Sequence, residues 1–120
     1  MLAGCVPWPD DLARLYREQG YWRDVSIPHH FAELTVAAPD RVALVEGARR
    51  YTRADIWLLS ERLAAHLHGL GLRSRQIAVF QLPNSADFLI TFLALTRLGV
   101  IPVLALPSHR QSRSCSHAHR

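Results

Sequence analysis

The sequence predicts an α/β fold in which helices pack on a mixed, partly parallel sheet. Residues 76–106 have the pattern of a strand, a helix and a second strand, and such a connection normally places its two strands in parallel. A Val- and Leu-rich segment at residues 41–46, followed by a turn at Gly47 and a second short strand at residues 49–51, predicts a hairpin, and the sheet is expected to be mixed. With 120 residues and 49% hydrophobic composition, the chain is long enough for one domain.

A short amphipathic helix is predicted over residues 10–19. Asp10 is placed to cap its start, and Gly20 is placed to end it. Its apolar side chains recur at intervals of three and four residues, which is the period of a helix with one buried face: Leu12, Leu15 and Tyr16.

A second helix is predicted to begin near Ser26 and Pro28. Proline suits the first turn of a helix because the N–H that it lacks would be unpaired there. Phe31 and Leu34 are expected to form the inner face of this helix, and Pro39 is expected to stop it.

Strands at residues 41–46 and 49–51 are predicted to form a hairpin that turns at Gly47. The next helix begins at a capping box, in which the Thr52 oxygen accepts a backbone N–H bond and the Asp55 carboxylate reaches back. This helix is expected to bury one stripe and to end at two glycines: Ile56, Leu59, Leu63, Leu67 and Leu70, then Gly69 and Gly71.

The strand-helix-strand unit starts with residues 76–82, an apolar run that fits a strand buried on both faces inside a sheet. Ser85 is expected to cap the helix that follows, and residues 100–106 form the second strand. No partner strand is evident for the far edge of this sheet, so we expect that more protein belongs here. The helix ends at Gly99, and its expected inner face is apolar: Phe88, Leu89, Phe92, Leu95 and Leu98.

The charges are unusual in kind, because all 14 positively charged side chains are arginines and lysine does not occur. Residues 1–107 hold 11 of them against 10 acidic residues, so this part of the chain is nearly neutral. The tail, residues 108–120, is rich in Ser, His and Arg and cannot contribute to a core. Its three arginines could neutralise only a few phosphates without an aromatic stacking platform, so no nucleic-acid partner is expected.

No residue is assigned a catalytic, cofactor-binding or metal-binding role. His66 and His68 are expected to point to different faces of their helix, and the adjacent His29 and His30 are expected to diverge for the same reason. Ser85 comes nearest to a nucleophile position, but its neighbours favour helix capping. The six glycines form no phosphate-binding loop, and the tail is not expected to hold a purpose-built metal site at its histidines: His109, His117 and His119.

Cys5 and Cys115 lie at opposite ends of the chain, with neither the spacing of a zinc site nor a disulfide framework. They are expected to be incidental thiols in a reducing cytosol. No secretion signal is evident, and the longest apolar runs are shorter than the roughly 20 residues that span a bilayer. A cytoplasmic chain without a membrane partner is therefore expected.

Several segments resemble a known family. The opening residues 8–22 resemble the start of the ligases that activate 2,3-dihydroxybenzoate and salicylate, which are adenylate-forming enzymes. The resemblance covers roughly residues 7–111 and continues in four further segments: residues 51–55, 79–84, 93–95 and 98–107. It implies that residues 1–107 are the N-terminal portion of an AMP-binding adenylation domain, a partial subdomain of the adenylate-forming fold.

In this family, the large N-terminal domain binds ATP, Mg²⁺ and the aryl acid. It forms an acyl adenylate with release of pyrophosphate, and the acyl group then passes to the phosphopantetheine thiol of an aryl carrier protein in siderophore biosynthesis. The phosphate loop with its lysine and the C-terminal catalytic lysine have no counterparts in these 120 residues, which contain no lysine. The resemblance therefore implies a fragment that is inactive alone and takes no cofactor by itself.

Three points stay open at this stage. The aryl acid could be 2,3-dihydroxybenzoate or salicylate, because the family builds the acid pocket from later segments. From Arg113 onward the sequence departs from the family pattern, which a shifted reading frame or a premature end would explain. The alternative function is a non-catalytic interaction module that binds an intact ligase or a carrier protein through exposed apolar surface.

Overall fold

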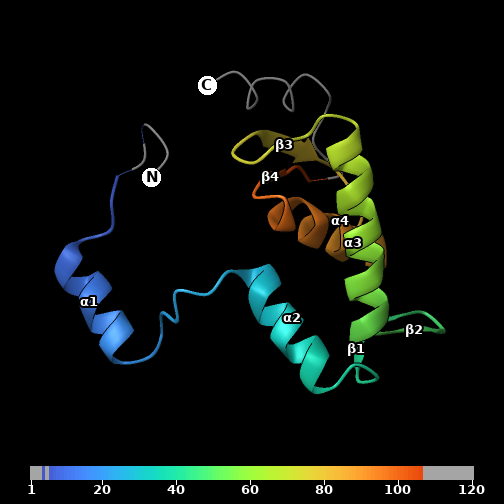
Figure 1. Ribbon diagram of the computed structural model, residues 1–120, viewed down its shortest axis with the longest axis horizontal. Helices are drawn as coiled ribbons and strands as arrows, with labels where there is room; N and C mark the ends of the chain where they lie inside the picture. The colour runs from blue at the N-terminus through green and yellow to red at the C-terminus, as the bar shows by residue number, and fades with distance from the viewer. Residues whose placement is uncertain (1–3, 5, 107–120) are drawn as a thin grey trace.

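The structure of the chain is a computed structural model, which describes Gly4 and residues 6–106. The predicted α/β class is confirmed by elements of both kinds. Figure 1 shows them in chain order: α1 (Asp10–Glu18), α2 (Ile27–Ala37), β1 (Val42–Glu46), β2 (Arg49–Thr52), α3 (Arg53–Gly69), β3 (Ile77–Phe80), α4 (Ala86–Arg97) and β4 (Ile101–Leu104).

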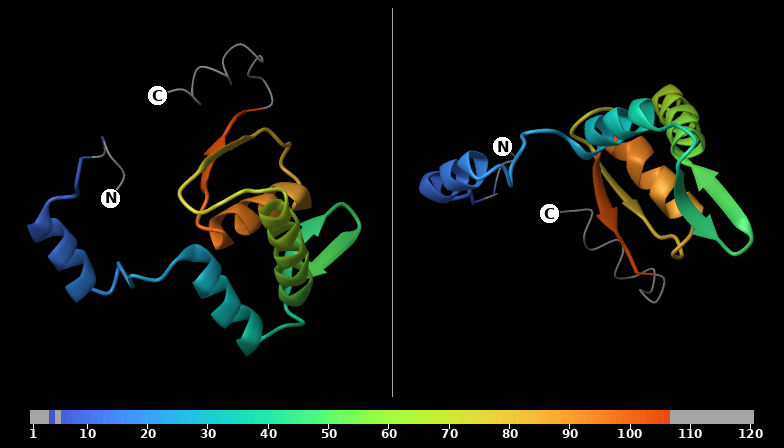
Figure 2. Two further views of the ribbon diagram at one scale, coloured as in Figure 1. Left: turned by 45° about the horizontal axis from the view of Figure 1, so that its top comes forward. Right: turned by 90° about the horizontal axis from the view of Figure 1, so that it is seen from below.

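Helix α4 lies at the centre of this arrangement. Figure 2 shows it between two layers, with helices α2 and α3 on one side and strands β3 and β4 on the other. A hydrophobic core cluster joins Ile56 of α3 to three side chains of α4, and half-buried side chains from α2 and the β1–β2 hairpin pack against it. The α4 members of the cluster lie on one face of the helix: Ala86, Ile90 and Leu93.

Arg97 ties the end of α4 to α3. Its guanidinium carbon lies 3.7 Å from the centre of the Trp57 ring, a cation–π contact, and its side chain is only 17% exposed. The same guanidinium donates to the Ser60 hydroxyl at 3.4 Å and forms an ion pair with Glu61 at 3.1 Å. Because the Arg97 side chain is largely shielded from water, its contact with the Trp57 ring stabilises the α3–α4 pair more than an exposed ion pair would.

The strands form two separate pairs, so the predicted single mixed sheet is wrong for the described residues. Strands β1 and β2 are antiparallel, with an irregularity between Val42 and Leu44, and β3 and β4 are parallel, with Ile77 opposite Ile101. The hairpin packs against α3 and does not pair with β3. Strand β3 was expected inside a sheet, but within the described residues it has one partner strand and is only partly buried.

Two helix starts follow the predicted local signals. The capping box before α3 is confirmed, because Asp55 N–H donates to Thr52 Oγ1 at 3.1 Å and Thr52 N–H donates to Asp55 Oδ2 at 2.8 Å. Bonds from the Thr52 backbone and hydroxyl hold the pKa of the Asp55 carboxyl below its ordinary value. Ser26 caps α2 by accepting a bond from His29 N–H at 3.4 Å.

Two other predicted caps are wrong. Pro9 occupies the capping position of α1, so Asp10 lies inside the first turn, and no side chain caps this helix. Ser85 does precede α4, but its hydroxyl donates to the Pro83 carbonyl at 3.3 Å. The Ala86 N–H at the start of α4 donates instead to Glu46 Oε1 of the hairpin at 3.1 Å. A carboxylate distant in sequence therefore satisfies this helix end.

The buried faces of α3 and α4 agree in part with the predicted stripes. On α3 the buried side chains are Ile56, Ser60 and Ala64, whereas Leu59 and Leu70 are 36% and 73% exposed. The prediction is right for Ile56, which is buried, and for Leu63, which packs against the core cluster. On α4, Leu95 is buried as predicted, and the other four predicted side chains are half-buried: Phe88, Leu89, Phe92 and Leu98.

Helix α1 stands apart from the rest of the described chain (Figures 1 and 2). The Cα radius of gyration is 16.6 Å, whereas a globular chain of this size has a value of about 13 to 14 Å. The helix predicted over residues 10–19 is confirmed as α1, and its apolar residues Leu12 and Leu15 are 37% and 40% exposed.

We predict that Glu46→Ala lowers the free energy of unfolding by about 1 kcal/mol, the usual value of a helix cap, because it leaves the Ala86 N–H unpaired. Glu46→Gln retains an acceptor oxygen and is expected to lose less. Urea unfolding of the two variants and the parent chain measures the difference. Equal stability of Glu46→Ala and the parent would contradict the capping role.

Candidate functional site

The two described histidine pairs lie on different helices, α2 and α3. His66 and His68 are exposed on the last turns of α3. Among the residues that the structure describes, no group of three or more His, Cys, Asp or Glu side chains is placed to hold a metal ion. The remaining histidines and both cysteines lie outside the described residues: His109, His117, His119, Cys5 and Cys115.

His29 and His30 were expected to diverge, and this prediction is wrong. His29 Nε2 lies 3.6 Å from Glu33 Oε1, and His30 Nδ1 lies 3.2 Å from Glu33 Oε2. Adjacent helical residues can both reach Glu33 because it follows them by four and three positions. Arg23, which precedes the helix, adds its guanidinium at 3.6 Å from the same carboxylate.

These contacts give Glu33 a distinctive electrostatic setting. A hydrogen bond with His30 lowers the pKa of the Glu33 carboxyl below its ordinary value, and the charges of His29 and Arg23 act in the same direction. The cluster is on the surface, where such pairs contribute little to stability. Its Arg23–Glu33 ion pair connects the segment before α2 to the helix.

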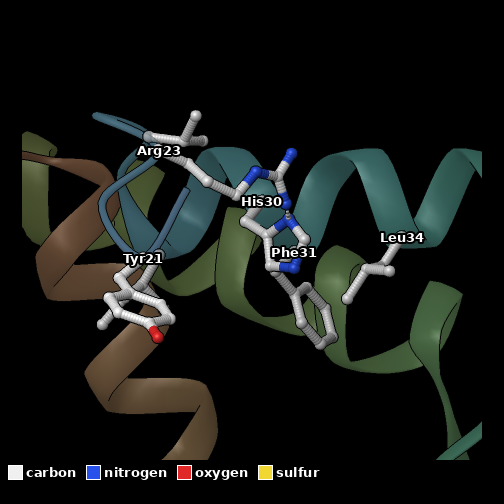
Figure 3. Close-up of a pocket in the computed structure, with 7 residues that line it drawn as sticks. Tyr21, Arg23, His30, Phe31 and Leu34 are labelled. Carbon is white, nitrogen blue, oxygen red and sulfur yellow. Dashed lines mark hydrogen bonds between the residues drawn. The ribbon is translucent and has the colours of Figure 1, made fainter. Parts of the chain in front are cut away.

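A groove of about 330 Å³ lies beside this cluster, between the segment that follows α1 and helix α2. In Figure 3, Tyr21, Phe31 and Leu34 extend along the groove, while Arg23 and His30 meet at its rim. Tyr21 is 72% exposed, so the groove is open to solvent. Phe31 and Leu34 make its floor apolar. The other lining residues are also apolar: Val25 and Ile27.

The segment before the groove is held by its own aromatic contacts. The Tyr16 and Trp22 rings lie 5.5 Å apart edge to face, and Trp8 lies 5.8 Å from Trp22. Arg17 stacks over Trp22 and binds Asp24 through a 2.7 Å hydrogen bond. This aromatic cluster occupies the same opening segment, residues 8–22, whose pattern resembles the aryl-acid ligases.

The resulting surface is an apolar groove with a charged rim, where His29 and His30 both contact Glu33. Ser85, the serine nearest to a nucleophile position, bonds a backbone carbonyl. Sequence reasoning missed the groove, because its lining comes from a loop and a helix face that only tertiary structure brings together.

Comparison with protein families decides the identity of the chain. The family model of AMP-binding enzymes, described as "AMP-binding enzyme", matches residues 31–117. The chain belongs to the AMP-binding enzyme family.

Individual family members show which branch the chain resembles. It is 42% identical to Triostin synthetase I of Streptomyces triostinicus, over 98% of this chain and 23% of that protein. It is 38% identical to the 2,3-dihydroxybenzoate-AMP ligase of Bacillus subtilis, over 93% of this chain and 21% of that protein. The Salicyl-AMP ligase of Mycobacterium tuberculosis is 37% identical over 91% of this chain and 20% of its own length. The predicted resemblance to aryl-acid AMP ligases is confirmed.

Solved structures of the family share this fold. The apo structure of Mycobacterium smegmatis MbtA superposes with a TM-score of 0.89 at 36% identity, over 97% of this chain and 22% of that one. The N-terminal subdomain of Klebsiella oxytoca NpsA gives a TM-score of 0.73 at 27% identity, over 78% of this chain and 25% of that one. The chain thus spans about a fifth to a quarter of the family members that it matches.

No helix in the described part of the chain combines the length and the hydropathy that crossing a membrane requires.

We predict that the Glu33 carboxyl titrates below its ordinary pKa and that His30→Gln moves its pKa upward, because His30 supplies the largest lowering contribution. A depressed pKa stabilises the fold above the unfolded pKa of about 4.3, and this contribution disappears as the pH falls through the folded pKa. An NMR titration of the side-chain carboxyl carbon measures the shift. His68→Gln, on another helix, is the matched control, and equal pKa values in both variants would contradict the assignment.

Proposed function

We propose that this chain forms the N-terminal part of an adenylation domain that activates an aryl acid, either 2,3-dihydroxybenzoate or salicylate. The observation that carries the proposal is the match to MbtA, which has a TM-score of 0.89 over 97% of this chain. The parent reaction joins ATP and the aryl acid to give aryl-AMP and pyrophosphate. The aryl group then passes to a carrier-protein thiol for siderophore synthesis.

The contribution of this chain to that reaction is architectural. Charge that develops on the α-phosphate during adenylation must be met by preorganised cations and hydrogen-bond donors. These 120 residues contain no lysine, and the described acidic side chains form no site that fits Mg²⁺. We therefore derive no catalytic step from this chain and assign ATP, Mg²⁺ and aryl-acid binding to the remainder of the domain.

Other features of the proposal rest on the sequence alone. Residues 1–107 are assigned to the adenylation domain, and residues 108–120 to a tail outside the core. A cytoplasmic location stays a prediction, as does the aryl carrier protein as acceptor.

A second candidate function is a non-catalytic interaction module that binds an intact ligase or a carrier protein. The open apolar groove favours it, because Tyr21 and Ile27 are 72% and 60% exposed beside a helix of the core. Under this hypothesis the chain binds a complete family member, whereas under the first it replaces the matching segment of one.

The experiment that tests the proposal grafts residues 1–107 into the Bacillus subtilis 2,3-dihydroxybenzoate-AMP ligase in place of its matching segment. We predict that the chimera catalyses aryl-acid-dependent ATP–pyrophosphate exchange within about tenfold of the parent ligase, a loss of about 1.4 kcal/mol or less in barrier terms. The 120-residue chain alone is expected to give no exchange with either aryl acid.

Three results separate the hypotheses. Exchange by the chain alone would show that it carries reaction machinery and would contradict the architectural role. A folded but inactive chimera would contradict the proposed function. An inactive chimera together with a stoichiometric complex between this chain and the intact ligase would favour the interaction module.

A further inference from the structure

The parallel pair β3–β4 has two outer edges, and the backbone contacts show which groups face each of them. Ile101 N–H donates to the Gln76 carbonyl at 2.8 Å, and Ala105 N–H donates to the Phe80 carbonyl at 3.0 Å. Alternate residues along a strand direct their backbone groups to opposite sides. The even-numbered residues of β3 therefore face β4, and the odd-numbered residues of β4 face β3.

The outer edge of β4 is poorly suited to a further strand. Its outward-facing residues are Pro102 and Leu104, by the alternation above. Pro102 has no N–H, so this edge lacks a donor in the middle of a strand of only four residues. Proline in a sheet is characteristic of edge strands, where the missing donor would have faced solvent.

The outer edge of β3 is open. Its outward-facing residues, Ile77 and Val79, each keep an N–H and a carbonyl, and no third strand pairs with β3 within the described residues. Ile77 is 49% exposed, so the edge also presents apolar surface. Proteins normally protect such an edge with charge, proline or a covering element. Neither strand residue carries charge, and proline is absent from β3.

We propose that the outer edge of β3 pairs with a strand from the remainder of an aryl-acid adenylation domain, and that this pairing forms even when that remainder is a separate chain. The inference rests on the proposed function, because it takes its partner from there. The edge is built so that the sheet grows on the β3 side and stops at Pro102 on the β4 side.

Two observations favour this partner over a second copy of the chain. The fold superposes on MbtA over 97% of its length but accounts for 22% of that chain, so most of that protein lies outside the matched segment. Helix α1 keeps its distance from the other elements, and the radius of gyration of 16.6 Å exceeds that of a globular chain of this size. MbtA has the same fold in a longer chain, so the open arrangement of these elements is expected if further protein packs between them.

The test co-expresses the 120-residue chain with a tagged Bacillus subtilis 2,3-dihydroxybenzoate-AMP ligase that lacks its matching segment. We expect a soluble one-to-one complex that catalyses 2,3-dihydroxybenzoate-dependent ATP–pyrophosphate exchange. If the truncated ligase stays insoluble or fails to bind the chain, the proposal is overturned.

Two proline substitutions test the edge itself. Ile77→Pro removes an outward N–H from β3, and Leu104→Pro removes an outward N–H from β4, at side chains that are 49% and 51% exposed. Neither N–H group takes part in the hydrogen bonds between β3 and β4. The circular dichroism spectra of both isolated variants should therefore match that of the parent chain. We expect Ile77→Pro to weaken the complex at least tenfold and Leu104→Pro to leave it unchanged, which makes Leu104→Pro the matched control.

The outcomes distinguish this inference from the function on which it rests. Equal binding by both variants would overturn the β3 edge as the docking site. An active covalent chimera without any complex from separate chains would overturn the inference while leaving the proposed function intact. A homodimer that Ile77→Pro disrupts, with no ligase complex, would assign the edge to a second copy and overturn the proposed partner.

Discussion

The packing of helix α3 against α4 is the contact on which the rest of the structure depends. Ile56 of α3 lies fully buried against the apolar face of α4, and Arg97 of α4 stacks over Trp57 at 3.7 Å. Helix α2 packs on both helices, the β1–β2 hairpin on α3, and β4 on α4. The fold is therefore a helix pair with one small sheet attached to each member.

Features encoded by neighbouring residues could be predicted from the sequence. The capping box at Thr52 and Asp55 and the end of α3 at two glycines depend on residues a few positions apart. The cap on α4 could not be predicted, because Glu46 is 40 residues from Ala86 and the local signal at Ser85 pointed elsewhere. On α3 the prediction was right for Ile56 and wrong for Leu59, because close packing selected the small side chain of Ser60 for the buried face.

In the candidate site too, contacts between neighbouring residues could be predicted and contacts between distant residues could not. Residue spacing explains why His29 and His30 both reach Glu33, and this signal was available in the sequence. The groove beside them required tertiary structure, because a loop residue, Tyr21, and a helix residue, Phe31, line it together. The expectation that more protein belongs to this sheet came from the unpartnered strand pattern. The open β3 edge gives that expectation a specific location.

The measurement that tests this account most directly is residue-resolved amide hydrogen exchange of the free chain. The account predicts that the slowest exchange lies in α3 and α4, and that β3 alternates, with Ile77 and Val79 exchanging fast while Ala78 and Phe80 are protected. Uniform protection along β3 would show that its outer edge is already paired, which would contradict an incomplete sheet. Faster exchange in α4 than in the hairpin would contradict the central place of the α3–α4 contact.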